Sequence, residues 1–337
     1  MWNSFRSYFA IDTKSLISYT FWVYAILIFI VRCSGLSTLE FTAYKRVIYL
    51  FVASDIIYNA IQITNQHAYE QTNSYVFFIV HGPSLYMNET MRSLLVISEI
   101  QAYMVGMSNN LVAFVFRYCL IVRSYCLTKL QFIVLIIVNI IWNHGFYFLA
   151  FIESQKPTNT QIEASKKALS PEFFIGTEGE PLQSTLVFNP TSVISYIGLT
   201  HICMSCVIVF VGLSITFIKI QAALIENKQI MTKSTRQLQK QVTLVMSIHV
   251  ITSLILFGIP MSITVFNIIL NVNTNDRGYG HIFMIIMVWP IVVNPICSII
   301  LIGPCFKKFC SILHIHTDGS NPKRRISQTT LGSMFAI

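Results

Sequence analysis

Long apolar runs that end in charged residues dominate the sequence. A helix that crosses a hydrocarbon core about 30 Å thick needs about 20 mostly apolar residues, and seven runs are of this kind. They are residues 15–31, 47–64, 93–116, 131–152, 190–218, 241–270 and 282–306. Backbone groups in lipid must be satisfied within their own segment, and the alternation typical of barrel strands is absent. The pattern therefore predicts an all-α membrane protein, a seven-transmembrane helix bundle formed by residues 1–310.

The regions between and after these runs are shorter or more polar. The apolar patch Tyr75–Val80 is too short to cross a bilayer and ends at Gly82 and Pro83, so we expect part of an ordered loop there. The loop 153–189 is long, acidic and interrupted by Pro and Gly, which is consistent either with a lid over a pocket or with disorder. Residues 311–337 are expected to form a disordered tail.

Composition agrees with a location in the bilayer. Hydrophobic residues make up 54% of the 337 residues and charged residues only 11%, whereas soluble domains carry about 25% charged residues. This argues against a water-soluble enzyme, and the large apolar content excludes a disordered chain.

Lys and Arg favour the cytoplasmic side of short loops. Sixteen of the 23 Lys and Arg residues follow the first, third, fifth and seventh runs, and nine of the 14 acidic residues lie on the opposite side. The N-terminus is therefore expected outside and the C-terminus in the cytoplasm. The net charge of +9 is then a signal of topology, and we expect no nucleic-acid partner.

Two polar residues stand out inside the spans. Asp55 lies nine residues after Arg46, and Asn294 lies nine residues before Gly303, so both are about 14 Å from the inner face and can meet near the middle of the membrane. Two interpretations are open: a polar switch that is hydrated or binds sodium, or a simple interhelical hydrogen bond. The cost of a buried carboxylate favours the switch.

Glu99 and three histidines are further ionisable residues within the apolar runs. Glu99, near the outer end of the third run, either binds a polar group of a ligand or extends toward outside water and pairs with Arg92. His144, His201 and His249 lie in separate runs without metal-ligand spacing, so neither a metal site nor a cofactor is expected.

Prolines and an arginine mark the inner half of the bundle. Pro260 interrupts the sixth run and Pro295 the seventh, and each predicts a kink. The third run ends in Phe116-Arg117-Tyr118, where Arg117 can pair with groups at the inner face.

Together, the seven runs, Asp55, Phe116-Arg117-Tyr118, Pro260 and Asn294-Pro295 resemble a G-protein-coupled receptor. Gly82-Pro83 and the segment Thr235–Gln241 make the chain similar to nematode serpentine chemoreceptors of the Str superfamily, with the Srd, Str and Srh groups nearest. The resemblance spans about residues 15–310.

The resemblance implies a multi-pass plasma-membrane receptor, with the sensory cilium as one location, that senses small molecules and activates a heterotrimeric G protein. It implies that Arg117 and Tyr118 hold the inactive state and then contact the G protein, and that the basic segment with Arg236 and Lys240 moves with the sixth helix. The chain departs from the rhodopsin pattern at Phe116, where an acid is usual, and at Ser298, where Tyr is usual. An ionic lock and a sodium site of the usual form are therefore not carried over.

A ligand is expected in the outer half of the bundle. Depth and aromatic or polar character select eight candidate contact residues, namely Glu99, Tyr103, His144, Tyr147, Tyr196, His201, Phe266 and Trp289. The alternatives are a transporter or a ligand-gated channel, but the helix number is odd and no repeat is present. An enzyme is not expected, since hydrolase and phosphate-loop motifs are absent.

Three modification sites are suggested by short motifs. Asn88-Glu89-Thr90 is a glycosylation acceptor on the expected outer side. Cys305 and Cys310 follow the seventh run and are either palmitoylated or buried interfacial thiols. Ser327 follows Arg324-Arg325 and suits a basophilic kinase, whose product would recruit an arrestin-like partner. All eight cysteines lie in runs or on the inner side, so no outer disulfide is expected.

Overall fold

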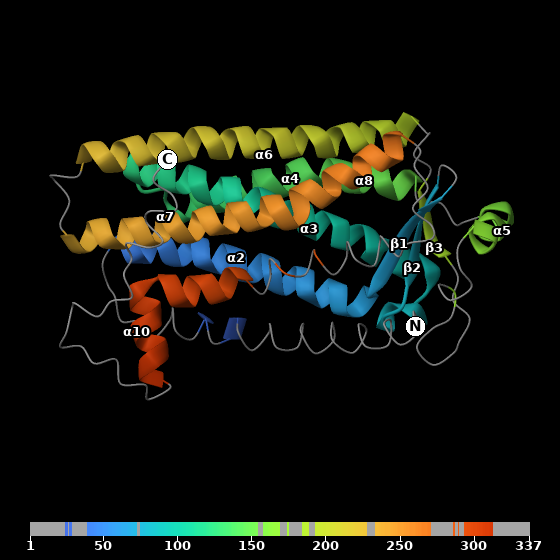
Figure 1. The fold of residues 1–337 in the computed structure, drawn as a ribbon, viewed down its shortest axis with the longest axis horizontal. Helices are drawn as coiled ribbons and strands as arrows, with labels where there is room; N and C mark the ends of the chain where they lie inside the picture. The colour runs from blue at the N-terminus through green and yellow to red at the C-terminus, as the bar shows by residue number, and fades with distance from the viewer. Residues whose placement is uncertain are drawn as a thin grey trace.

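Long helices lie side by side along the long axis of the molecule, with a small sheet across one end (Figure 1). The computed structural model describes residues 24–25, 27–28, 39–72, 75–153, 158–168, 174, 184–188, 193–227, 233–270, 286, 289 and 293–312. Its helices are α2 (Leu39–Asn65), α3 (Glu89–Ile121), α4 (Lys129–Glu153), α5 (Asn159–Ala168), α6 (Val193–Glu226), α7 (Lys233–Ser253), α8 (Ile259–Ile269) and α10 (Gly303–Ile312).

Four of these helices contain stretches long and apolar enough to cross a membrane. The stretches are Tyr44–Asn65, Glu89–Ile121, Tyr196–Glu226 and Arg236–Leu256. A shorter apolar helix covers Lys129–Gly145, and the segments Val293–Leu301 and Cys305–Ile312 form an apolar pair bent by 93°. Most of the predicted run 15–31 and of the segment 282–292 lies outside the described residues.

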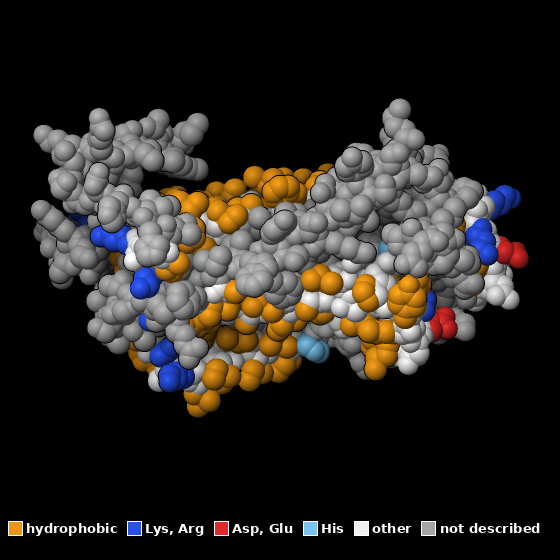
Figure 2. Space-filling model, turned by 90° about the horizontal axis from the view of Figure 1, so that it is seen from below, with side chains coloured by type: hydrophobic (Ala, Val, Ile, Leu, Met, Phe, Trp, Pro, Cys, Tyr) orange, Lys and Arg blue, Asp and Glu red, His pale blue; other side chains and the backbone are white. Residues whose placement is uncertain are grey.

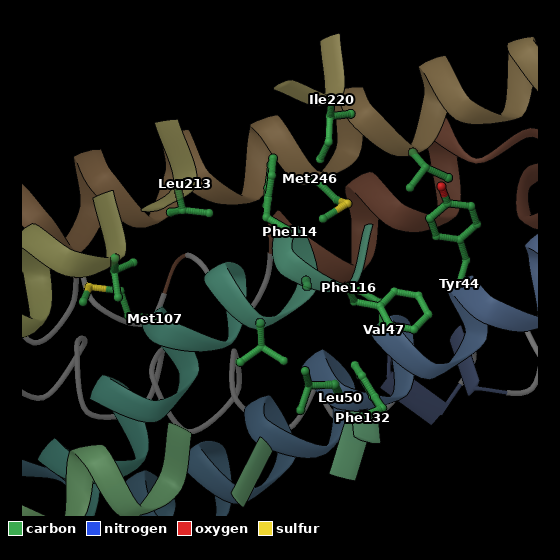
Figure 3. Close-up of a cluster of buried hydrophobic side chains, with 14 of the residues drawn as sticks. Tyr44, Val47, Leu50, Met107, Phe114, Phe116, Phe132, Leu213, Ile220 and Met246 are labelled. Carbon is green, nitrogen blue, oxygen red and sulfur yellow. The ribbon is translucent and has the colours of Figure 1, made fainter. Parts of the chain in front are cut away.

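The centre of the bundle is α3, which contacts α2, α4, α6 and α7. Its buried face carries Phe114 and Phe116, which belong to one apolar cluster with Tyr44 of α2 and Met246 of α7 (Figure 3). Between the helices, polar side chains add hydrogen bonds: Asn109 of α3 donates to Ser54 of α2 at 2.7 Å and accepts from Asn139 of α4 at 2.9 Å. Each of these groups would be costly in lipid if it were unpaired.

The outside of the bundle is apolar where a water-soluble protein would be polar. On α4 and α6, Ile137, Ile141, Val207 and Val211 are exposed. On the face shown in Figure 2, hydrophobic side chains fill the middle of the molecule and charged side chains gather at its two ends. This distribution suits a bundle whose middle is covered by lipid.

A three-stranded antiparallel sheet closes one end. Strand β1 (His67–Thr72) pairs with β2 (Tyr75–Val80), which pairs with β3 (Ser184–Phe188). Tyr75–Val80 thus belongs to an ordered connection between α2 and α3, but it forms a strand and not a loop, because the adjacent β1 and the distant β3 pair with its backbone on both sides. The loop 153–189 contains α5 and β3, so disorder throughout it is wrong.

The Gly82-Pro83 pair has a structural reason. Gln66 leaves α2 with a positive φ of 43° and the chain enters β1, while Gly82 returns from β2 and donates its N–H to the Asn65 carbonyl at 2.8 Å. A Cβ on Gly82 would lie 2.5 Å from the Thr64 carbonyl oxygen, so only glycine fits. Pro83 then begins a short 3₁₀ turn that ends at Tyr86.

Candidate functional site

Arg117 joins α3 to α7 at the end of the bundle opposite the sheet. Its side chain is completely buried, at 0% exposure. The guanidinium donates to the backbone carbonyl of Gln239 at 2.7 Å, to the Gln239 side-chain oxygen at 3.3 Å and to the Thr243 hydroxyl. Tyr44 of α2 donates to the same Gln239 side-chain oxygen at 2.5 Å. We call Arg117, Gln239, Thr243 and Tyr44 the inner lock.

The inner lock uses neutral acceptors. The oxygen acceptors that Arg117 contacts are a backbone carbonyl, a carboxamide and a hydroxyl, and none of them carries a charge. Phe116 occupies the position at which the rhodopsin pattern has an acidic residue. It is buried against Phe132, with 5.1 Å between the ring centroids. A buried cation without a carboxylate partner retains much of its desolvation cost. The closed arrangement is therefore less stable, relative to an arrangement in which Arg117 meets water or an acidic group, than it would be if Arg117 formed an ion pair.

Tyr118 points away from the inner lock. Its ring lies 5.9 Å from the Arg123 guanidinium carbon and 5.8 Å from Lys219 Nζ of α6. Of the two predicted basic residues of α7, Arg236 is half-buried and Lys240 is exposed. The structure thus separates the two residues that the sequence placed together, with Arg117 facing α7 and Tyr118 facing basic groups near α6.

Asp55 and Asn294 line the same cavity near the middle of the bundle. The cavity has a volume of about 30 Å³ and is bounded by α2, α7, the segment Val293–Leu301 and Tyr24, which is enough space for a water molecule. Tyr24 donates to the Asp55 carboxylate at 2.7 Å, and His249 Nε2 lies 3.2 Å from the Asn294 carbonyl oxygen. Within the described ranges, the Asn294 side-chain oxygen has no hydrogen-bond partner, so the cavity presents hydrogen-bonding capacity to a small occupant.

Pro260 follows a π-helical segment, Leu254–Gly258, that separates α7 from α8. Proline has no N–H and its ring crowds the carbonyl four residues earlier, and the wider π turn accommodates this. Ser262 and Thr264 return hydrogen bonds to the carbonyls of Gly258 and Pro260 at 2.6 and 3.0 Å. The predicted interruption of the sixth helix is therefore located just before Pro260, and such π segments often mark functional positions.

Near the sheet, Glu99 is buried at 2% exposure. Its Oε2 accepts from the Asn65 amide at 2.9 Å and lies 3.0 Å from His67 Nδ1. Arg92 instead donates to the carbonyls of Leu85 and Met87 at 2.9 and 3.2 Å. The predicted Glu99–Arg92 pair is wrong, because β1 brings His67 to the carboxylate and the 3₁₀ turn brings carbonyls to Arg92.

A group of polar side chains lies between α2 and α3, next to Glu99 on the side away from the sheet. Tyr58 and Tyr103 meet edge to face, with 5.3 Å between their ring centroids. Within the described part of the chain, the Tyr58 hydroxyl and the Gln62 side-chain oxygen on this face of α2 have no hydrogen-bond partner. Asn59 is also completely buried without such a partner there, but it lies on the face of α2 that carries Asp55. We call Tyr58, Gln62, Glu99 and Tyr103 the α2–α3 seam.

Sequence reasoning missed the α2 half of this seam. The available signal was spacing, because Tyr58, Gln62 and Asn65 follow one another at i, i+4 and i+7 on one helical face. Lone amides and tyrosines in an apolar helix give little indication of partners until the facing helix is known.

The remaining predicted ligand contacts are dispersed. His144 Nδ1 lies 2.6 Å from the Gln101 side-chain nitrogen, and the His201 ring packs on Trp142 at 5.3 Å. Tyr196, Phe266 and Trp289 are 55%, 61% and 46% exposed. The Tyr147 side chain lies outside the described residues. Of the eight predicted contacts, the structure brings Glu99 and Tyr103 together in the α2–α3 seam.

The modification motifs have different settings. Asn88 is exposed, and its side-chain oxygen caps α3 by accepting from the Met91 N–H at 2.8 Å. Cys305 and Cys310 of α10 are both buried, which is compatible with the alternative of buried interfacial thiols, and palmitoylation stays a prediction. Ser327 lies outside the described residues.

Comparison with known proteins supplies the family. The fold is similar to that of squid rhodopsin, with a TM-score of 0.54 and 8% sequence identity, over 87% of this chain and 80% of the rhodopsin chain. No curated protein matches the sequence. The model of the family described as serpentine type 7TM GPCR chemoreceptor Str matches residues 11–310. With its membrane-spanning helices, its rhodopsin-like fold and this match, the chain belongs to the Str family of seven-transmembrane, G-protein-coupled chemoreceptors.

Proposed function

We propose that this receptor detects a small odorant or pheromone-like molecule and in response activates a heterotrimeric G protein. It acts as a multi-pass protein of the plasma membrane, including the membrane of sensory cilia. The observation that carries the proposal is the inner lock, in which a fully buried Arg117 holds α7 through neutral groups.

The sheet end of the bundle is outside the cell and the α10 end is in the cytoplasm. Two observations support this orientation. Sixteen of the 23 Lys and Arg residues follow the odd-numbered runs. In the view of Figure 2, Asp and Glu are visible only at the end with the sheet and α5. Positively charged residues favour the cytoplasmic side of a membrane.

The ligand binds in the outer half and engages the α2–α3 seam. Among the described residues, the buried Tyr58 hydroxyl and Gln62 side-chain oxygen have no partner, and each such atom costs about 1–3 kcal/mol. A ligand that supplies hydrogen bonds to them recovers part of this cost. On α3, Glu99 and Tyr103 are also proposed to contact the ligand. A ligand shifts the equilibrium between the inactive and active receptor only if it binds one of them more tightly. We propose that the distance between α2 and α3 differs in the two arrangements and causes this difference in affinity.

The response to the ligand is an outward swing of α7 about the π-helical segment before Pro260. The swing withdraws Gln239 and Thr243 from Arg117, which opens the inner lock. Arg117 and Tyr118, together with Arg236 and Lys240 of α7, then face the G protein. The cavity with Asp55 and Asn294 lies between the hinge and the inner lock, and its polar groups exchange partners during this movement.

The test is a screen of small volatiles and secreted metabolites on cells that express the receptor, with G-protein activation as the readout. Arg117→Ala removes the charged donor that is proposed to face the G protein once the inner lock opens, so we expect ligand-evoked activation to fall by at least about tenfold. The hydrogen bonds to Gln239 and Thr243 that it also removes belong to the closed arrangement, so their loss frees α7 without replacing the contact with the G protein. Arg123→Ala, a change of the same kind at an exposed position, is the control and is expected to keep most of the response. Normal signalling by Arg117→Ala would remove its assigned role. Ligand-evoked current that persists without any G protein would instead favour a channel.

A further inference from the structure

Gln241 links α7 to α10. Its side-chain oxygen accepts the backbone N–H of Gly303, the first residue of α10, at 3.1 Å. The first N–H groups of a helix have no partner within that helix, so this contact between residues 62 positions apart satisfies an otherwise open donor. The contact fastens the start of α10 to the inner part of α7.

The absence of a side chain at Gly303 allows the Gln241 carboxamide to approach the backbone closely. A Cβ there would lie 3.3 Å from both the nitrogen and the oxygen of the Gln241 carboxamide, which is tighter than most side-chain contacts. Nearby apolar packing supports the same junction, because Val245 of α7 shares one buried cluster with Ile302 and Cys305. The carboxamide therefore has a defined seat against the α10 backbone.

Gln241 and Gln239 hold opposite sides of α7. Successive residues of an α-helix are rotated by about 100°, so residues two apart point about 200° away from each other. Gln239 meets Arg117 and Tyr44 on one side, and Gln241 meets Gly303 on the other. Hydrogen bonds are lost beyond about 3.5 Å, so a displacement of α7 by a few ångströms strains both contacts.

We infer that Gln241 is a positioning residue that couples α7 to α10, so that α10 shifts its seat when the inner lock opens. This rests on the proposed function, because it takes the outward swing of α7 as the activating movement. The bent junction between Val293–Leu301 and α10 is the part that absorbs the shift. The contact stabilises the inactive arrangement in addition to Arg117.

Two variants remove the contact from its two sides. Gln241→Met keeps the side-chain length and removes the acceptor, and Gly303→Ala adds a Cβ that displaces the carboxamide. Each is expected to raise ligand-independent G-protein activation by about two- to tenfold, the equivalent of one hydrogen bond. Gln221→Met, the same change at a half-buried glutamine near the inner end of α6, is the matched control and leaves activation unchanged.

The position of α10 is measured separately from signalling. Labels at exposed Leu130 of α4 and Ser311 of α10, attached by chemistry that avoids the eight native cysteines, report the distance between these helices in purified receptor. We expect Gln241→Met to change this distance without ligand, and Gln239→Ala to change it as well. We also expect the effects of Gln239→Ala and Gln241→Met on basal activation to combine to less than their product, because the two contacts open together.

Unchanged label distances in Gln239→Ala, or effects that multiply independently, would overturn the coupling. If the distances change as expected and no variant alters G-protein activation, the coupling stands and the proposed signalling role fails. If Arg117→Ala abolishes signalling and Gln241→Met alters neither readout, the signalling role stands and the coupling fails.

Discussion

Thr243 can be substituted so that the inner lock loses hydrogen bonds while the volume of the side chain hardly changes. Its hydroxyl accepts from Arg117 and donates to the Gln239 carbonyl at 2.7 Å. Valine has a similar volume and removes both hydrogen bonds. The buried guanidinium is then less well satisfied in the closed arrangement, whereas an open arrangement with hydrated Arg117 is unaffected.

We therefore expect Thr243→Val to raise ligand-independent activation by about two- to tenfold, corresponding to ~0.5–1.5 kcal/mol, with basal G-protein turnover as the measurement. The control is Ser247→Ala, which removes a hydroxyl that bonds only to the Thr243 carbonyl of its own helix in the described contacts. Basal activation at or below that of the unsubstituted receptor would show that Thr243 does not hold the closed arrangement.

At the scale of elements, the junction between α2 and β2 depends on the absence of a side chain at position 82. A Cβ on Gly82 would meet three backbone atoms of Thr64 and Asn65 at 2.5–2.8 Å, and backbone cannot move aside as a flexible side chain can. Overpacking of this kind costs about 1–3 kcal/mol. The same junction sets the position of His67, and through it the Glu99 carboxylate.

Gly82→Ala is accordingly expected to lower the thermal unfolding temperature of purified receptor and to reduce its amount at the cell surface. Gly106→Ala is the matched comparison, because a Cβ on Gly106 meets nothing within 4 Å and replacing glycine within a helix gains about 1 kcal/mol. Equal stability of the two variants would contradict the close approach between Gly82 and α2.

At the scale of the whole molecule, the proposed orientation has the sheet end in the external medium. Epitope tags on the two ends of the chain are expected to behave differently in intact cells. The N-terminal tag should bind antibody without permeabilisation, and the C-terminal tag should require it. Detection of both tags on one side of the membrane would overturn the odd number of crossings.

Asn88 gives a second measurement of the same orientation. Asn88→Gln would disturb the cap of α3, so Thr90→Ala is the better variant, since it removes the glycosylation motif and leaves the cap. We expect it to abolish a mass shift that glycosidase removes from the unsubstituted receptor. Thr90→Ser retains the motif and serves as the control.

The sequence by itself determined the membrane class and the positions of most helices. Apolar runs mark the part of each helix that lies in hydrocarbon, which is why α3 extends to Ile121 beyond the run that ends at 116, and α7 begins at Lys233 before the run that begins at 241. Polar ends of helices carry no hydropathy signal. Asp55, Arg117 and Pro260 were recognisable because a charge or a missing N–H inside an apolar helix has a cost that composition alone reveals.

The tertiary structure decided the partners of these residues. Glu99 pairs with His67 instead of Arg92, Arg117 binds neutral groups of Gln239 and Thr243, and Tyr75–Val80 forms a strand because β1 and β3 lie on either side of it. Hydrogen bonds act over about 3 Å, and the chain segments that make them are up to 195 residues apart. Only the packing of the helices brings such segments together, so residue type indicates that a polar group needs a partner, and the fold determines which partner it has.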